Sequence, residues 1–206
     1  MSATAQLETV APSTYGRDAS TARFSVARYE RMIEEGILTR DHPVELLENY
    51  VVLKMPRSAR HDGTVQLLVK RLGRRLPEGW DIRSQSAIRL SDSQPEPDLA
   101  IVRGDEAAYV TRHPYPEDIG LVVEVADSSL LRDQRDKSRI YARAGIVAYW
   151  IVNLADRRIE VHTAPSGATE AAEYMASQSY ESGESVALSL ASAESMSIPV
   201  DELLPD

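Results

Sequence analysis

Two acidic residues accompany apolar runs that have the pattern of strands. Asp98 opens the run in "QPEPDLAIV", and Glu124 lies inside "LVVEVADSS". An ionised carboxylate in a strand covered on both faces is costly unless a cation meets it. If the two strands are neighbours in one sheet, both side chains can point into one groove, where they would raise each other's pKa. A divalent cation removes that cost, and oxygen ligands suit Mg²⁺ or Mn²⁺.

The same two residues also have a purely structural interpretation. Asp98 could cap a turn, and Glu124 could pair with an arginine, because structural ion pairs also perturb buried carboxylates. Spacing alone leaves both interpretations open.

A lysine follows on the next predicted element. Lys137 lies in the first half of a helix expected over residues 131–145, and Tyr141 lies one turn later on the same face. A lysine beside a metal-bound water could orient that water or stabilise phosphate charge. The alternatives are a solvent-facing lysine and a half-buried packing tyrosine, and for Tyr141 we favour packing.

The segments before Asp98 predict two helices and a hairpin. "FSVARYERMIEEG" predicts a helix that begins at a Ser25 cap and ends at Gly36. "VELLENYVVLKM" predicts a hairpin with its turn near Glu48 and Asn49. "HDGTVQLLVKRLGRRL" predicts an amphipathic helix. The apolar stripe of that helix consists of Val65, Leu68, Val69, Leu72 and Leu76.

Strands dominate the rest of the chain. "DIRSQSAIRL" predicts a strand with Ile82, Ile88 and Leu90 in one phase, followed by short strands in "PDLAIVRG" and "GLVVEVAD". After the helix over 131–145 come strands in "VAYWIVNL" and "RIEVHT", then one or two edge strands and a terminal turn. The central order of helix, three strands, helix, strand predicts a mixed α/β layer fold. We expect residues 1–22 to be a disordered tail and residues 23–206 to form a single domain.

Composition limits the class of protein. The chain has 206 residues, of which 43% are hydrophobic and 27% charged, as in a soluble globular domain. It has no cysteine, so disulfides and thiolate metal sites are excluded. No apolar run reaches the length of a transmembrane helix, and the first residues lack the pattern of a secretion signal. We therefore expect a cytoplasmic protein.

The charge is unevenly distributed. Residues 164–206 contain eight acidic residues and no lysine or arginine, and so carry −8 of the net charge of −9. Residues 54–90 contain nine basic and three acidic residues. A basic surface for nucleic acid is therefore compatible with the acidic total, although solvated helix faces explain the same pattern.

Several motifs in order resemble a known family. "VARYERMIEEGILTRDHPVELLENYVV", "PEPDLAIV", "LVVEVADSS" and "RDKSRIYARAGIVAYWIVNL" are similar to the PD-(D/E)XK nuclease superfamily. More closely they resemble the Uma-type family of restriction endonucleases, over about residues 24–163. The resemblance implies a restriction-endonuclease-like core with an N-terminal helix and hairpin and C-terminal edge strands.

The resemblance also implies roles for individual residues. Asp98, after Pro97, matches the metal-binding aspartate, and Glu124 matches the second acidic residue. Two positions after Glu124, where the superfamily usually has its lysine, this sequence has Ala126. In Uma-type relatives the lysine is thought to lie on the next helix, and Lys137 matches that place.

Two earlier residues match the family as well. Glu45 matches a glutamate before the core and could be a further ligand or base; otherwise it is a surface strand residue. His61 matches a histidine that opens the first core helix, where it could contact a phosphate or hold Glu45. Its alternative is an exposed or capping histidine. Asn49 replaces a glycine common in relatives, at a turn that carries no chemistry.

The resulting expectation is a Mg²⁺-dependent endonuclease that acts on DNA. Asp98, Glu124 and a backbone carbonyl near Val125 would hold the ion, with Mn²⁺ as a possible substitute. Phosphates would be neutralised by arginines. The arginines considered are Arg57, Arg60, Arg74 and Arg75. A homodimer is expected, because many nucleases of this superfamily cut two strands with two subunits.

Two other functions compete with this expectation. The chain could be a catalytically silent nucleic-acid-binding or assembly module, with the acidic C-terminal segment covering a surface or mediating dimer contacts. The carboxylate pair could also be the acid and base of a glycosidase. With 6% aromatic residues there is little to stack on sugars, so that interpretation ranks last.

Overall fold

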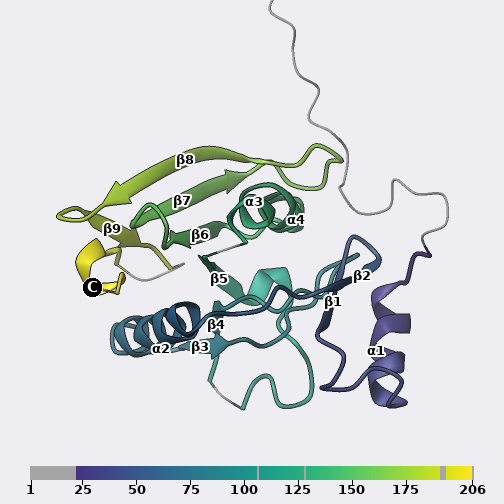
Figure 1. Ribbon diagram of the computed structural model, residues 1–206. Helices are drawn as coiled ribbons and strands as arrows, with labels where there is room; N and C mark the ends of the chain where they lie inside the picture. The colour runs from purple at the N-terminus through teal and green to yellow at the C-terminus, as the bar shows by residue number, and fades with distance from the viewer. Residues whose placement is uncertain (1–21, 106, 128, 191–193, 206) are drawn as a thin grey trace, which may run out of the picture.

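A six-stranded mixed sheet forms the centre of the protein (Figure 1). The computed structural model describes residues 22–105, 107–127, 129–190 and 194–205. The strand order is β3-β4-β5-β6-β7-β8, and every neighbouring pair is antiparallel except β5 and β6, which are parallel. The strands are β3 (Trp80–Ser84), β4 (Leu99–Arg103), β5 (Ile119–Ala126), β6 (Ala148–Asn153), β7 (Arg158–Pro165) and β8 (Tyr174–Glu181).

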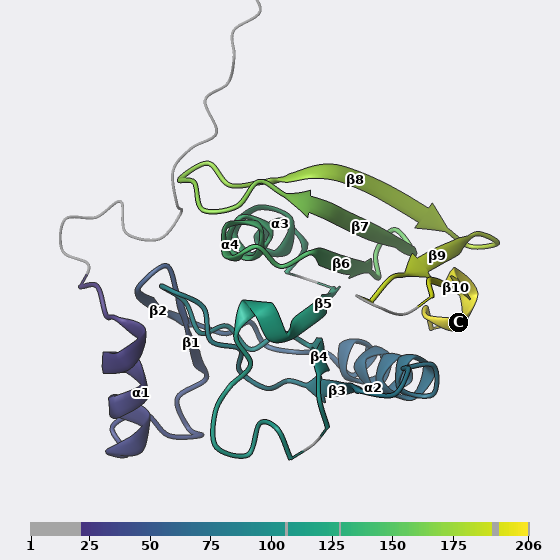
Figure 2. The same cartoon turned by 180° about the vertical axis from the view of Figure 1, so that it is seen from behind.

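Helices cover both faces of this sheet, on opposite sides in Figures 1 and 2. Helix α2 (Ala59–Gly73) packs Leu68 and Leu72 against one face, and α4 (Ser138–Ala144) packs against the other. Successive side chains of a strand alternate between faces. Every residue of β5 is buried as a result, including Glu124. The predicted order of helix, three strands, helix, strand is confirmed.

The N-terminal helix and hairpin form as predicted. Helix α1 (Val26–Glu34) is capped by Ser25, whose Oγ accepts from the Arg28 amide at 3.3 Å. Strands β1 (Val44–Leu47) and β2 (Tyr50–Leu53) form a two-stranded sheet. Glu48 and Asn49 between them have φ angles of 50° and 69°, as a tight two-residue hairpin turn requires.

The strand predicted over residues 81–90 is half the expected length. Strand β3 ends at Ser84, and Gln85 has a φ of 48°, which turns the chain out of the sheet. Ile82 consequently packs with the α2 side, whereas Ile88 and Leu90 pack on the α4 side. The prediction that these three residues share one phase is therefore wrong.

The helix predicted over 131–145 is interrupted. Its parts are α3 (Leu130–Arg132), a π-helical turn η2 (Asp133–Lys137) and α4, which ends at Gly145 with a φ of 78°. This segment carries the chain from β5 to its parallel neighbour β6, which needs such a crossover.

The acidic C-terminal segment belongs to the fold. Strand β8 extends the sheet; β9 (Ser185–Leu188) pairs with β10 (Met196–Pro199), and η3 (Val200–Glu202) follows. Two short helical turns, η1 (Pro116–Asp118) and η3, complete the elements. Apolar side chains from β9, β10 and η3 join the core under α2. The segment is therefore a structural layer, and its strands do not lie over the cleft described below.

The tail predicted for residues 1–22 falls, apart from Ala22, outside the described residues. Among the described residues, no helix combines the length and the apolar character needed to cross a bilayer.

Candidate active site

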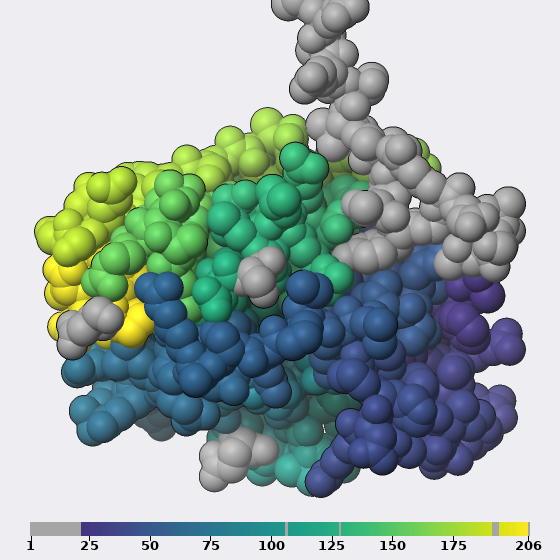
Figure 3. Space-filling view, in the orientation of Figure 1, coloured from purple at the N-terminus to yellow at the C-terminus, as the bar shows by residue number. Residues whose placement is uncertain are grey.

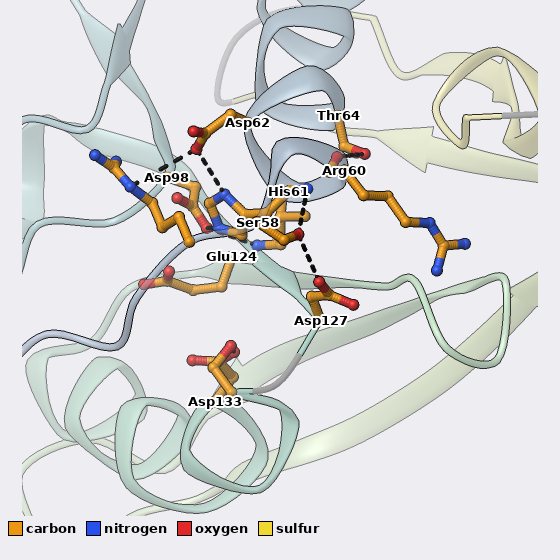
Figure 4. A network of polar contacts seen from close by, with 12 residues as sticks. Ser58, Arg60, His61, Asp62, Thr64, Asp98, Glu124, Asp127 and Asp133 are labelled. Carbon is orange, nitrogen blue, oxygen red and sulfur yellow. Dashed lines mark hydrogen bonds and ion pairs between the residues drawn. The ribbon is translucent and has the colours of Figure 1, made fainter.

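Strands β4 and β5 bring the two predicted carboxylates together. Leu99 pairs with Val123 in antiparallel register, so Asp98, one residue earlier, lies opposite Glu124, one residue later. Figure 4 shows both side chains where β4 begins and β5 ends, near the first turn of α2. The two strands are therefore neighbours in one sheet, as a groove shared by the two carboxylates requires.

Asp98 is held by two donors. Its Oδ2 lies 3.1 Å from Nε2 of His61 and accepts from the Val125 amide at 2.8 Å. Burial alone would raise the pKa of Asp98, but the contact with His61, the Val125 amide and the charge of Lys137 together lower it below its usual value. Asp98 is therefore ionised near neutral pH.

His61 completes this pair from the other side. Burial would lower the pKa of His61, but Asp98 and Asp62 outweigh it and raise the pKa. The second ring nitrogen, Nδ1, lies 3.2 Å from Oδ1 of Asp62. The imidazole is thus fixed between two carboxylates, and it contacts Asp98 rather than Glu45, the alternative stated above.

Glu124 is held by the crossover segment. One of its oxygens, Oε1, accepts from Nζ of Lys137 at 2.8 Å and from Oη of Tyr141 at 2.7 Å. Glu124 is 3% exposed, and burial raises its pKa well above the usual value, helped by Asp98 and Asp133 and opposed by Lys137. The partner of the buried glutamate is a lysine, not an arginine.

Lys137 points into the protein and not into solvent. It is 8% exposed; burial would lower its pKa, but Glu124, Glu45 and Asp133 together raise it well above the usual value. Tyr141 is fully buried, as its predicted packing role requires, and its hydroxyl also serves Glu124.

Asp133 is a site residue that sequence reasoning missed. It is 2% exposed, its Oδ2 accepts from Ser129 Oγ at 2.6 Å, and its pKa is raised to about 6, chiefly by burial. A signal was present in the sequence. Asp133, Lys137 and Tyr141 follow one another at intervals of four, which puts them on one side of a helix.

Glu45 reaches the same cleft from β1. It is 3% exposed, and its Oε2 accepts from the Glu96 amide at 3.3 Å. Glu96 in turn is ion-paired with Lys54. Glu45 therefore lies in the wall of the cleft and is not a surface residue.

A cleft of about 560 Å³ is lined by Glu45, His61, Asp98, Glu124, Asp133 and Lys137. Figure 3 looks onto this side, where the surface is hollowed between the blue chain before α2 and the green α3–α4 segment. Ser58, the N-cap of α2, bridges the two walls, because its Oγ donates to Oδ2 of Asp127 at 2.6 Å (Figure 4). This hydrogen bond therefore connects the end of β5 to the start of α2. Gln85, directly after the end of β3, also lines the cleft.

The positive charge of the cleft comes partly from unexpected residues. Arg57 lines it as expected, together with Lys54 and Arg132. Arg60 instead donates to the Leu154 carbonyl at 3.0 Å, and Arg75 is paired with Glu202 at 2.6 Å. Arg74 directly follows the last residue of α2, about 20 Å along the helix from His61. Of the four arginines considered, only Arg57 adjoins the cleft.

The donor set suits a small divalent cation. The described residues contain no group of three or more His, Asp or Glu side chains placed to hold a metal ion. Mg²⁺, however, is usually bound by one or two carboxylates together with water and substrate phosphate. Among the described residues, Asp98 Oδ1 and Glu124 Oε2 have no hydrogen-bond partner. The amide and carbonyl of one strand residue point to the same edge, so the Val125 carbonyl faces the side of Asp98.

Comparison with protein families gives a match over most of the chain. Residues 26–201 match the family model Uma2, described as "Putative restriction endonuclease". No curated protein matches.

A solved structure is similar in fold. It is the crystal structure of a "putative nuclease belonging to DUF820" from Anabaena variabilis ATCC 29413, with a TM-score of 0.59. The match covers 87% of this chain and 97% of that chain at 8% sequence identity. The likeness establishes the fold and carries no residue roles.

Proposed function

Because this chain belongs to the Uma2 family of "putative restriction endonucleases", with a restriction-endonuclease-like fold, we propose that it is a Mg²⁺-dependent endonuclease acting on DNA. The observation that carries the proposal is the meeting of Asp98, Glu124 and Lys137 in one cleft. Three charged side chains buried together without a function would be a large cost to folding.

Asp98 and Glu124, with the Val125 carbonyl, would hold the cation. Bound there, Mg²⁺ (or Mn²⁺) supplies Lewis-acid stabilisation of a phosphate oxygen and lowers the pKa of a coordinated water. The excess of carboxylates over cations around Glu124 favours such an ion. Burial is the largest cause of the raised pKa of Glu124, and a cation would relieve the repulsion by Asp98 and Asp133 that adds to it.

The protein side chains orient the reacting groups. His61 and the Val125 amide fix Oδ2 of Asp98, and Tyr141 fixes Oε1 of Glu124. Lys137, cationic at neutral pH because its pKa is raised, has an ammonium group that can donate to a phosphate oxygen or to the attacking water. Glu45, a further buried carboxylate that lines the cleft, would accept a proton from that water.

Substrate binding would use the basic rim. Arg57 and Arg132 line the cleft beside the carboxylates, so phosphates next to the cut bond can be neutralised. Lys54 lines the cleft as well, paired with Glu96. Binding should therefore weaken as salt rises. We also propose a homodimer, because two such clefts are needed to cut both strands at once; light scattering of the purified chain tests this.

Nicking of supercoiled plasmid tests the function. We expect nicking by the wild type in Mg²⁺ or Mn²⁺, none in EDTA, and a loss of at least about 100-fold in Asp98→Asn. Asp41→Asn, an exposed aspartate outside the cleft, is the matched control and should nick normally. Equal nicking by Asp98→Asn, or by the wild type in excess EDTA, would refute the proposal.

A further inference from the structure

A second cavity of about 490 Å³ lies between α1, β3 and the long loop that joins β4 to β5. In Figures 1 and 2 this loop lies below the sheet, on the side of α1. The volume falls within the range of about 300–1,000 Å³ typical of small-ligand sites. We call it the arginine–tyrosine pocket, after the side chains that line it.

Its wall is an alternating stack of arginines and tyrosines. The guanidinium carbons of Arg83 and Arg112 lie 5.4 and 5.1 Å from the ring centre of Tyr109. Arg112 and Arg89 lie 5.1 and 5.7 Å from the ring centre of Tyr115. Such planar groups, held in place by one another, offer flat faces for stacking.

Two of the three arginines are already neutralised. Arg89 is bonded to both carboxylate oxygens of Glu30, at 2.8 and 3.3 Å, and Arg112 to both of Asp118, at 2.5 and 3.2 Å. Arg83 has no carboxylate partner among the described residues, and its buried Nε has no hydrogen-bond acceptor there. Arg83 therefore has a buried donor that no group of the described residues uses.

An unused acceptor lies in the same pocket. Gln94 is 3% exposed, and its buried Oε1 has no hydrogen-bond donor among the described residues. Buried polar groups without partners are uncommon in folded proteins and call for an explanation. Arg83, with its unused donor, and Gln94, with its unused acceptor, both line this cavity. They fit a ligand whose edge carries both hydrogen-bond acceptors and donors.

The charges of the pocket do not favour a free polyanion. Glu30 and Glu34 line it from α1. Burial, helped by the charge of Arg83, lowers the pKa of His113, so this ring is neutral at pH 7. A mostly neutral, planar group fits this balance better than an isolated phosphate does.

The pocket adjoins the cleft of the candidate active site. Arg83 lines the pocket and Gln85 the cleft; Gln94 lines the pocket and Glu96 the cleft. In each case the two residues are two positions apart, which is at most about 7 Å of chain. The two cavities therefore share the walls formed by these segments.

We propose that the arginine–tyrosine pocket binds the base of an unpaired nucleotide in the nucleic-acid strand that the adjacent cleft holds. This inference rests on the proposed function, since it names the kind of strand on which that site acts. A nucleobase has two flat faces for the arginine–tyrosine stack and an edge with donors and acceptors for Arg83 and Gln94. A base within an intact duplex offers no free face to the stack, so the substrate is single-stranded or has a base turned out.

Binding without cleavage tests the inference. A fluorescein-labelled single-stranded 12-mer of DNA and the same sequence as duplex are titrated with the full chain in EDTA. The four deoxynucleoside monophosphates and 2-deoxyribose 5-phosphate, which has no base, are used as competitors. Gln94→Leu and Arg83→Met remove the unused acceptor and donor, while Arg40→Met, an exposed arginine outside both cavities, is the matched control.

We expect tighter binding of the single strand than of the duplex, and competition by nucleotides but not by 2-deoxyribose 5-phosphate. Both pocket variants should bind the single strand about tenfold more weakly, with unchanged melting temperatures, and Arg40→Met should bind normally. Competition by the free nucleotides would show that the pocket accepts a base without its strand; binding of the single strand without such competition would assign it to the strand alone.

Unchanged binding in both pocket variants, or equal competition by 2-deoxyribose 5-phosphate, would overturn the inference. This failure is distinct from failure of the proposed function. If the wild type nicks plasmid in Mg²⁺ and the pocket variants bind the single strand normally, only the base-pocket inference is refuted. If binding depends on the pocket but no nicking occurs, only the proposed nuclease function is refuted.

Discussion

The Nζ atom of Lys137 lies 2.8 Å from Oε1 of Glu124, and Tyr141 donates to the same oxygen. Both donors come from the crossover segment between β5 and β6, whereas the carboxylate comes from the central strand. Contact between that segment and the sheet therefore fixes one oxygen of Glu124, while the other has no hydrogen-bond partner among the described residues.

Replacement of Lys137 should remove activity without removing binding. Lys137→Met keeps most of the buried stem but loses the ammonium, so nicking should fall about 100- to 1,000-fold. Tyr141→Phe, which removes a single hydrogen bond to the same oxygen, is the graded comparison and should lose much less. Nicking rates and anisotropy of labelled DNA separate the two effects; a Lys137→Met enzyme with the wild-type rate would show that the lysine is structural.

Asp133 should make the protein less stable as pH rises. Burial first, and then the charges of Asp98 and Glu45, raise its pKa from 3.8 to about 6, against the attraction of Lys137 and the hydrogen bond from Ser129. An acid whose pKa is raised by folding opposes folding once it ionises. The free energy of unfolding should thus fall between about pH 4 and pH 6 and then level off.

Asp133→Asn removes this titration. Two pKa units correspond to about 3 kcal/mol, so the variant should be more stable than the wild type by up to that amount at pH 7 and no more stable at pH 4. Urea unfolding in EDTA at both pH values measures the difference. An equal difference in the free energy of unfolding between variant and wild type at pH 4 and pH 7 would contradict the titration of Asp133.

Removal of residues 184–206, the last part of the acidic C-terminal segment, should unfold the protein. A chain ending at Gly183 loses seven buried apolar side chains, worth about 10–20 kcal/mol at about 1.5–3 kcal/mol each, which exceeds the usual total stability of about 5–15 kcal/mol. These side chains are Val186, Leu188, Leu190, Ile198, Val200, Leu203 and Leu204. Circular dichroism of the shortened chain checks this; a folded product with greater DNA affinity would instead support a covering role for the acidic segment.

Two glycines should respond oppositely to a single methyl group. A Cβ at Gly120 would lie 2.6 Å from the Trp80 ring and 2.7 Å from Leu190, so Gly120→Ala should cost about 1–3 kcal/mol. At Gly63, within α2, a Cβ would have no atom of the described residues within 4 Å apart from its chain neighbours and the backbone of the helix itself, so Gly63→Ala should stabilise by about 1 kcal/mol. Thermal melts of both variants test the pair; equal shifts would contradict the packing at Trp80.

The sequence was sufficient to predict the strands that carry Asp98 and Glu124, because short apolar runs bounded by turn residues indicate buried strands. It also predicted a helix around Lys137, although not its π-helical turn. It could not predict that His61 contacts Asp98, because this contact depends on how α2 packs against the start of β4. The spacing of residues along the sequence does not show how two such elements pack.

Other features were missed for identifiable reasons. The left-handed Gln85 reverses the faces of Ile88 and Leu90, and alternation alone cannot show such a turn. Strand β8 has mostly exposed side chains, so its sequence lacks the apolar alternation of a strand. The π-helical turn that contains Asp133 and Lys137 adds no distinctive residue type.

The two sides of the active site belong to two different hydrophobic layers. His61 is carried by α2, whose core includes the C-terminal strands, and Lys137 precedes α4, whose core lies on the opposite face of the sheet. A slight separation of either layer from the sheet on heating would move one partner of a carboxylate while leaving most secondary structure intact. On heating, activity should therefore be lost several degrees below the melting temperature of the chain, because it depends on contact of both layers with the sheet.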